Sequence, residues 1–190
     1  MSRPITLMLL VLALFSVAAA SAAQSEVFVL RTPQDFRLGW QKGTWYEWIP
    51  SAESVEDWSQ MITVQIYTVA PSVTQSEFLQ GIAARWMKAC PETPKPSTFS
   101  GQTNGYPVSM LLLSCPHNAQ TGQPETTALR VILGNERLYS VQRAFRSVPQ
   151  PEQLAVAMKF LGTVTVCDTT RPNHPCAADA TPFTVPSSTP

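Results

Sequence analysis

The stretch that decides the fold runs from Thr74 to Trp86 and reads TQSEFLQGIAARW. It opens with a capping box, T-x-x-E, in which the first and fourth side chains each satisfy a backbone amide at the start of a helix. Phe78, Ile82 and Trp86 then recur every four residues, which places them on one face at the helical period. The stretch therefore predicts an amphipathic helix that ends near Cys90.

Segments that favour β-strands lie on both sides of this helix. Residues 61–67 alternate cleanly, so that Ile62, Val64 and Ile66 share one face. Other strands are expected at residues 27–30, 108–113, 128–133 and 138–145. The four residues between the last two are few enough to close an antiparallel hairpin.

A second helix is expected from Pro151 to about Leu161, with Gly162 as its C-cap. Helices placed between antiparallel hairpins indicate an α+β sandwich, with the helices on one face of the sheet. Residues 24–168 are expected to form a single domain of this class. Residues 169–190 are rich in Pro, Thr, Ser and Ala, and are expected to form a disordered tail, apart from a local knot if Cys167 and Cys176 pair.

The N-terminus has the three zones of a secretory signal peptide, which predicts export. Arg3 supplies the positive charge, residues 5–17 are almost entirely apolar, and residues 18–23 are small. An apolar run of about 13 residues is shorter than the roughly 20 residues that a membrane-spanning helix needs. We therefore expect cleavage after Ala22 or Ala23, and a soluble, periplasmic or secreted mature chain without a transmembrane segment.

The four cysteines, Cys90, Cys115, Cys167 and Cys176, all lie in the expected mature chain. In an exported protein they favour disulfides over a metal site, and the paired C-x-x-C or His spacing of metal ligands is missing. Of the three possible pairings, the sequence-local Cys90–Cys115 and Cys167–Cys176 are favoured. Oxidised cysteines would also leave no thiolate nucleophile.

The sequence contains no pattern typical of a catalytic site or a cofactor. His117 in a turn and His174 in the tail have no partner at a recognisable spacing, and both are expected to be exposed. Thirteen basic and thirteen acidic residues cancel. Because no basic stripe is present, nucleic-acid binding is disfavoured.

The aromatic stretch 38–50 is a candidate binding surface. It carries Trp40, Trp45, Tyr46 and Trp48, and its internal glycines favour a bent or hairpin strand pair. In an extended strand Tyr46 and Trp48 face one way and Trp45 the other, which leaves aromatic surface for a protein partner or a small ligand. Ordinary core packing, with helices over both faces, is the alternative.

Arg143 is a further candidate, for contact with a ligand anion. Strict alternation places it on the same face as Tyr139, Val141 and Phe145. A cation on an apolar face needs a carboxylate or an aromatic plane. A purely structural role, through a bulge or a place at the rim of the sheet, is the alternative.

Two other functions stay open. The acids Glu53, Glu56 and Asp57, next to Trp58, suit a hydrolase of cell-wall glycans, although they equally suit the first turn of a helix. A protruding loop such as Gly101–Pro107 suits a small, disulfide-bonded inhibitor or immunity-type protein that blocks an enzyme.

Three segments resemble a family of small exported proteobacterial proteins, themselves uncharacterised, whose arrangement is similar to the Mog1/PsbP-like α/β/α sandwich. The segments are WSQMITVQ (58–65), LYSVQRAF (138–145) and Cys167-Asp168. The resemblance covers roughly residues 40–168 and implies a fold, but no activity and no catalytic residues. With export, expected disulfides and neutral charge, it favours a non-catalytic binding or accessory protein of the bacterial cell envelope.

Overall fold

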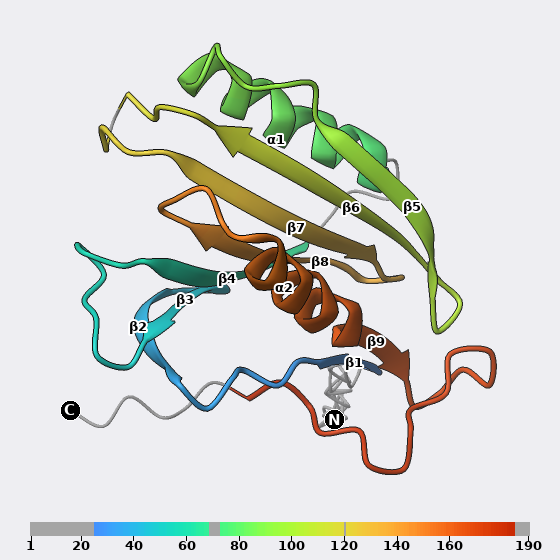
Figure 1. Ribbon diagram of the computed structural model, residues 1–190. Coiled ribbons are helices and arrows are strands. Elements are labelled where there is room, and N and C mark those ends of the chain that lie inside the picture. Colours follow the sequence, from blue (N-terminus) through green and yellow to red (C-terminus); the bar gives the residue numbers. More distant parts are fainter. Residues whose placement is uncertain (1–24, 69–72, 120, 185–190) are drawn as a thin grey trace, which may run out of the picture.

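The computed structural model describes residues 25–68, 73–119 and 121–184 (Figure 1). These residues form nine strands and two helices. In chain order the elements are β1 (Glu26–Val29), β2 (Phe36–Lys42), β3 (Trp45–Pro50), β4 (Gln60–Thr68), α1 (Gln75–Ala89), β5 (Ser97–Thr103), β6 (Tyr106–Cys115), β7 (Glu125–Leu133), β8 (Arg137–Phe145), α2 (Pro151–Thr163) and β9 (Thr165–Asp168).

Seven strands form one antiparallel sheet in the order β2-β3-β4-β8-β7-β6-β5, and β1 pairs with β9 in a separate ribbon. The two helices lie on opposite faces of the sheet (Figure 1). On one face Leu79 of α1 packs with Leu129, and on the other Leu161 of α2 packs with Ile132. The predicted α+β class, an antiparallel sheet with two helices in an α/β/α arrangement, is confirmed. The expectation drawn from the order of hairpins and helices, that both helices lie on one face, is wrong.

The strand β7 explains why one layer of helices is not enough. Its residues from Thr126 to Ile132 are all buried. Because successive side chains of a strand point to opposite faces, a strand buried along both faces needs a cover on each side. α1 packs against β6 and β7, and α2 packs against β7 and β8.

The predicted capping box at the start of α1 is present. The Glu77 amide donates to Thr74 Oγ1 at 3.2 Å, and the Thr74 amide donates to the Glu77 carboxylate at 2.9 Å. Replacing Thr74 with alanine is expected to lower the free energy of unfolding by about 1 kcal/mol, because an N-cap acceptor is lost. Urea denaturation measures this loss. Ser147→Ala, an exposed loop change with the same hydroxyl loss, is the control and is expected to change stability by less than about 0.5 kcal/mol.

Two strands were not expected from the sequence. β5 pairs with β6 through a turn at Asn104-Gly105, where the φ angles are 48° and 77°. Two successive positive φ values are those of a tight hairpin turn, which Asn-Gly favours. β9 follows α2 directly and pairs with β1, from Glu26 opposite Asp168 to Val29 opposite Thr165.

Residues 169–184 lie against the domain, whereas their composition predicted a disordered tail. The Phe183 amide donates to the Phe28 carbonyl at 2.7 Å, and the Phe183 ring contacts those of Tyr46 and Trp48. One aromatic side chain therefore anchors a segment whose average composition is polar. The expected signal peptide, residues 1–23, and residues 185–190 lie outside the described residues.

Neither α1 nor α2, the helices of the described ranges, has the length and apolar character needed to cross a bilayer.

Candidate functional site

The aromatic hairpin β2–β3 divides its four candidate residues between the core and the surface. Trp48 is 2% exposed and belongs to the core under α2. Tyr46 shares that face and is half-buried against Phe183. Trp40 and Trp45 lie on the other face, where they are 36% and 43% exposed. The alternation expected for this strand is present, but only two of the four rings are left on the surface.

Trp40 and Trp45 form an aromatic pair, and Glu47 lies beside them on the same face of the hairpin. Their ring centroids are 5.4 Å apart at an interplanar angle of 81°, an edge-to-face arrangement. Glu47 is paired with Trp40 across the two strands and follows Trp45 by two residues, so its side chain is on the same face. Burial raises the pKa of Glu47 and outweighs the hydrogen bond with Trp45, which lowers it.

The same face continues with uncharged polar side chains toward the middle of the sheet. Glu47 is opposite Thr63, which is opposite Gln142, and Trp45 is opposite Gln65. The two helices do not contact β2 or β3 extensively, because α1 packs on β6 and β7. We name Trp40, Trp45 and Glu47 the tryptophan surface. It offers apolar ring area beside one carboxylate, which suits recognition rather than catalysis.

Arg143 is buried, and its surroundings account for it. It is 7% exposed, its guanidinium lies 4.6 Å from the ring centroid of Phe36 and 5.7 Å from that of Phe160, and Nη2 donates to Gln60 at 2.8 Å. Desolvation lowers the pKa of Arg143, and the charge of Asp35 partly opposes this shift. Its Nε has no hydrogen-bond partner among the described residues, but the two rings and Gln60 are partners of the kind that a buried cation needs, which favours a structural role over an exposed surface.

Arg130, which the sequence reasoning missed, is buried without such partners. It lies in β7 opposite Val141, on the α2 face of the sheet, and is 8% exposed. Its buried Nε–H donates to no acceptor within the described part of the chain, and no carboxylate there forms an ion pair with Arg130. Desolvation lowers the pKa of Arg130. The sequence contained a signal for Arg130. Strict alternation places it on the same face as the apolar Ala128 and Ile132, just as alternation places Arg143 on an apolar face.

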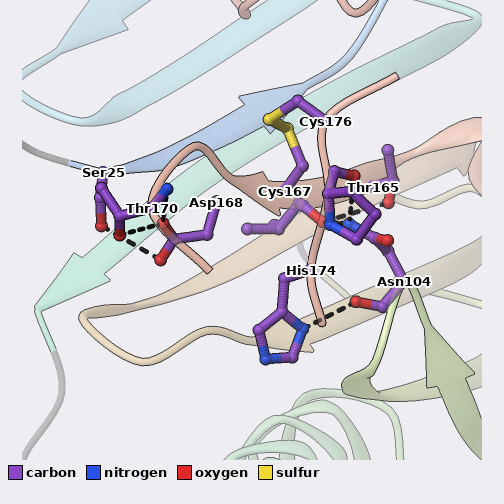
Figure 2. The surroundings of a disulfide bond; sticks show 10 residues. Ser25, Asn104, Thr165, Cys167, Asp168, Thr170, His174 and Cys176 are labelled. Atoms are coloured by element: carbon purple, nitrogen blue, oxygen red, sulfur yellow. Dashed lines mark hydrogen bonds between the residues drawn. A yellow bond between two sulfur atoms is a disulfide. The ribbon is translucent and has the colours of Figure 1, made fainter. Parts of the chain in front are cut away.

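The C-terminal loop is closed by a disulfide between Cys167 and Cys176 (Figure 2). Cys90 is bonded to Cys115. Both bonds are the sequence-local pairs that were expected. Together they suggest an extracytoplasmic protein, since disulfides persist mainly in oxidising compartments.

His174 in this loop is buried rather than exposed. Its ring stacks on Tyr106 with the centroids 4.0 Å apart, and its Nδ1 is 2.9 Å from the Asn104 carbonyl oxygen (Figure 2). The Asn104 side chain donates to Val166 and Pro175 at 3.0 and 3.1 Å. The Gly101–Pro107 segment, expected to protrude, is therefore a hairpin tip held by the C-terminal loop.

A cavity of about 490 Å³ lies beside this loop, lined among others by Val29, Arg31, Asn104 and Thr163. Its volume is within the range of small-molecule sites. Arg31 and Asp179, both exposed, approach to 3.9 Å at its edge. An exposed pair of this kind contributes little to stability.

The acidic segment does not have the features of a glycosidase site. Both carboxylate oxygens of Glu53 accept from Ser59 at 2.6 Å, so this acid is occupied in holding a turn. Glu56 and Asp57 are exposed, and a hydrogen bond from Ser54 lowers the pKa of Glu56. A general acid needs a raised pKa. The residues form turns rather than the helix that was the alternative.

His117 is exposed in its turn, as expected. Within the described ranges, no three or more His, Cys, Asp or Glu side chains gather closely enough to hold a metal ion.

Comparison with known proteins finds similarity of fold. No protein-family model matches the chain, and no curated protein matches its sequence. Among solved structures, LpqN of Mycobacterium tuberculosis, described as involved in cell envelope biogenesis, matches with a TM-score of 0.51 and 12% identity over 77% of this chain and 86% of LpqN. The Ran-binding protein Mog1p of Saccharomyces cerevisiae matches at 0.44 and 13% over 72% and 78%, and PsbP (CyanoP) of Synechocystis sp. PCC 6803 at 0.39 and 9% over 81% and 98%.

Proposed function

We propose that the chain is a non-catalytic binding or accessory protein of the bacterial cell envelope, which meets a partner through the tryptophan surface. The observation that carries the proposal is the edge-to-face pair of Trp40 and Trp45, 36% and 43% exposed, beside the partly buried Glu47. Tryptophan is enriched among the residues that dominate binding energy in interfaces.

Compartment and fold support the same proposal. Two disulfides are typical of a protein outside the cytoplasm. The structural match with LpqN, a protein of cell envelope biogenesis, is consistent with an envelope role but concerns the fold alone. Both carboxylate oxygens of Glu53 accept from Ser59, and a hydrogen bond from Ser54 lowers the pKa of Glu56, which favours binding over catalysis.

The experiment compares the exported chain with the variant Trp40→Ala/Trp45→Ala by cross-linking in envelope extract. We expect at least one cross-linked partner to be lost with the variant. Once that partner is purified, its affinity for the variant is expected to fall by about thirtyfold or more, because a truncated interface hot spot costs about 2 kcal/mol.

Val156→Ala is the matched control, since Val156 is a 60% exposed apolar side chain on α2, on the opposite face of the sheet from the tryptophan surface. It is expected to retain the partner. If every cross-linked partner of the wild-type chain remains with the double variant at unchanged affinity, the tryptophan surface is not the binding site. A captured enzyme that loses activity on binding would instead identify an inhibitor.

A further inference from the structure

Arg130 is a largely buried cation, 8% exposed, to which no described residue offers a counter-charge or an aromatic plane. Moving a guanidinium out of water costs several kcal/mol unless a counter-charge or hydrogen bonds replace the solvent. Arg143, on the neighbouring strand and the same face, has Gln60 and two aromatic rings. Arg130 has neither kind of partner among the described residues, and its Nε is buried without an acceptor. Such a group is typical of a binding site for an anion.

An apolar strip leads from the edge of the sheet to Arg130. Phe99 on β5 is opposite Met110 on β6, and Met110 is opposite Arg130 on β7, so the three share one face. Leu112 follows Met110 by two residues on that face. Phe99 is 58% exposed, and Met110 and Leu112 are half-buried at the border of the core.

The α2 helix leaves this strip open. α2 packs on β7 and β8 of the same face, whereas α1 lies behind the sheet (Figure 1). The unpaired positive charge thus lies at the inner end of an apolar surface whose outer end is exposed. A ligand that complements both ends has an anionic head and a hydrocarbon tail.

We propose that Arg130 and the strip formed by Phe99, Met110 and Leu112 bind a fatty acid, with its carboxylate on the Arg130 guanidinium and its chain along the strip toward β5. The planar guanidinium offers two parallel donors to a carboxylate, and the three apolar side chains remove the chain from water. This site is on the opposite face from the tryptophan surface and does not depend on the proposed function.

The first test uses the oxidised, exported chain and three probes in isothermal titration. Laurate has both head and tail, methyl laurate has the tail without the charge, and acetate has the charge without the tail. We expect laurate to bind at least about thirtyfold more tightly than either of the others, since loss of one partner of a buried charge pair costs about 2 kcal/mol or more. Equal binding of laurate and methyl laurate, or no binding of laurate, would overturn the proposal.

The second test is Arg130→Met, which keeps an unbranched apolar side chain as far as the position of Nε and removes the charged guanidinium. We expect the melting temperature of the ligand-free protein to rise, because an uncompensated buried cation is removed, and laurate affinity to fall at least about thirtyfold. Phe99→Ala, at an exposed position, is expected to keep the fold and weaken laurate binding. An unchanged laurate affinity in Arg130→Met contradicts the proposal.

Arg31→Met is the matched control. Arg31 is exposed and lines the cavity beside the C-terminal loop. It is expected to leave laurate binding unchanged. Loss of binding in Arg31→Met, but not in Arg130→Met, would place the fatty acid in that cavity and refute the Arg130 site.

Discussion

Replacing both Cys167 and Cys176 with alanine is expected to lower the free energy of unfolding by about 3 kcal/mol, the loop-closure term for roughly ten residues. The effect extends beyond the sulfur atoms, because the closed loop holds His174 on Tyr106 and against Asn104. Without the bond, the loop is expected to separate from the β5–β6 hairpin tip while the sheet stays folded. Urea denaturation measures the stability, and hydrogen exchange locates the change.

The Asp168 amide is the reporter for this loop, since it donates to the His174 carbonyl at 2.7 Å. Its exchange is expected to accelerate in Cys167→Ala/Cys176→Ala. The control Cys90→Ala/Cys115→Ala opens the longer disulfide loop and is expected to lower the free energy of unfolding by a similar amount, roughly 3 to 4 kcal/mol. It is not expected to accelerate exchange of the Asp168 amide selectively. Equal protection of the Asp168 amide in the two double variants would show that the disulfide does not order the loop.

The C-terminal loop also shows where composition misleads. A segment rich in Pro, Thr and Ser predicts disorder because it has little apolar area to bury. Here a few residues decide the outcome: Cys176 restricts the chain, His174 fills the space next to Gly105, and Phe183 completes an aromatic cluster. A Cβ on Gly105 would lie 2.8 Å from His174 Nδ1, so the hairpin tip and the loop fit only with glycine there. Such contacts are between residues distant in sequence, and composition does not contain them.

Predictions from short sequence patterns were correct where the interactions involve residues that are close in sequence. The capping box at Thr74 and the alternation in residues 61–67 depend on neighbours along the chain, and both are present in the structure. The β5–β6 hairpin was predictable as well, because Asn104-Gly105 is a strong turn signal that the sequence reasoning did not use. Helices on both faces follow from β7, in which Ala128 and Ile132 face one side and Leu129 and Val131 the other, as is typical of a strand buried on two sides.

The candidate site was predictable only in part, since exposure is a property of the whole fold. Alternation separates Trp45 from Tyr46 and Trp48, but the position of α1 over β6 and β7 is what leaves Trp45 uncovered. Arg130 and Arg143 have the same sequence signal. In three dimensions, Phe36, Phe160 and Gln60 surround Arg143 and account for its burial. Arg130 has no such neighbours among the described residues.

Glu26→Gln is expected to lower the free energy of unfolding by about 2 to 3 kcal/mol, because it replaces a charged acceptor in a buried cluster of donors. The Glu26 carboxylate, 3% exposed, accepts from the Tyr139 hydroxyl at 3.2 Å, the Glu136 amide at 3.3 Å and the Asn135 amide. It connects β1 to the turn between β7 and β8. A Cβ on Gly134 would lie 2.5 Å from this carboxylate, which indicates how closely the turn fits it.

The substituted side chain keeps one acceptor oxygen, but its NH2 group takes the place of the other oxygen and meets a backbone amide that also donates. Burial raises the pKa of Tyr139, so its proton stays in place. Urea denaturation measures the loss. Glu136→Gln removes the same charge from the adjoining turn, where the side chain is exposed, and is expected to change stability by less than about 0.5 kcal/mol. In the Tyr139→Phe background, Glu26→Gln is expected to lower the free energy of unfolding by less, because the hydrogen bond from the Tyr139 hydroxyl to Glu26 is already absent. If Glu26→Gln and Glu136→Gln have equal effects, the buried carboxylate does not attach β1 to the sheet.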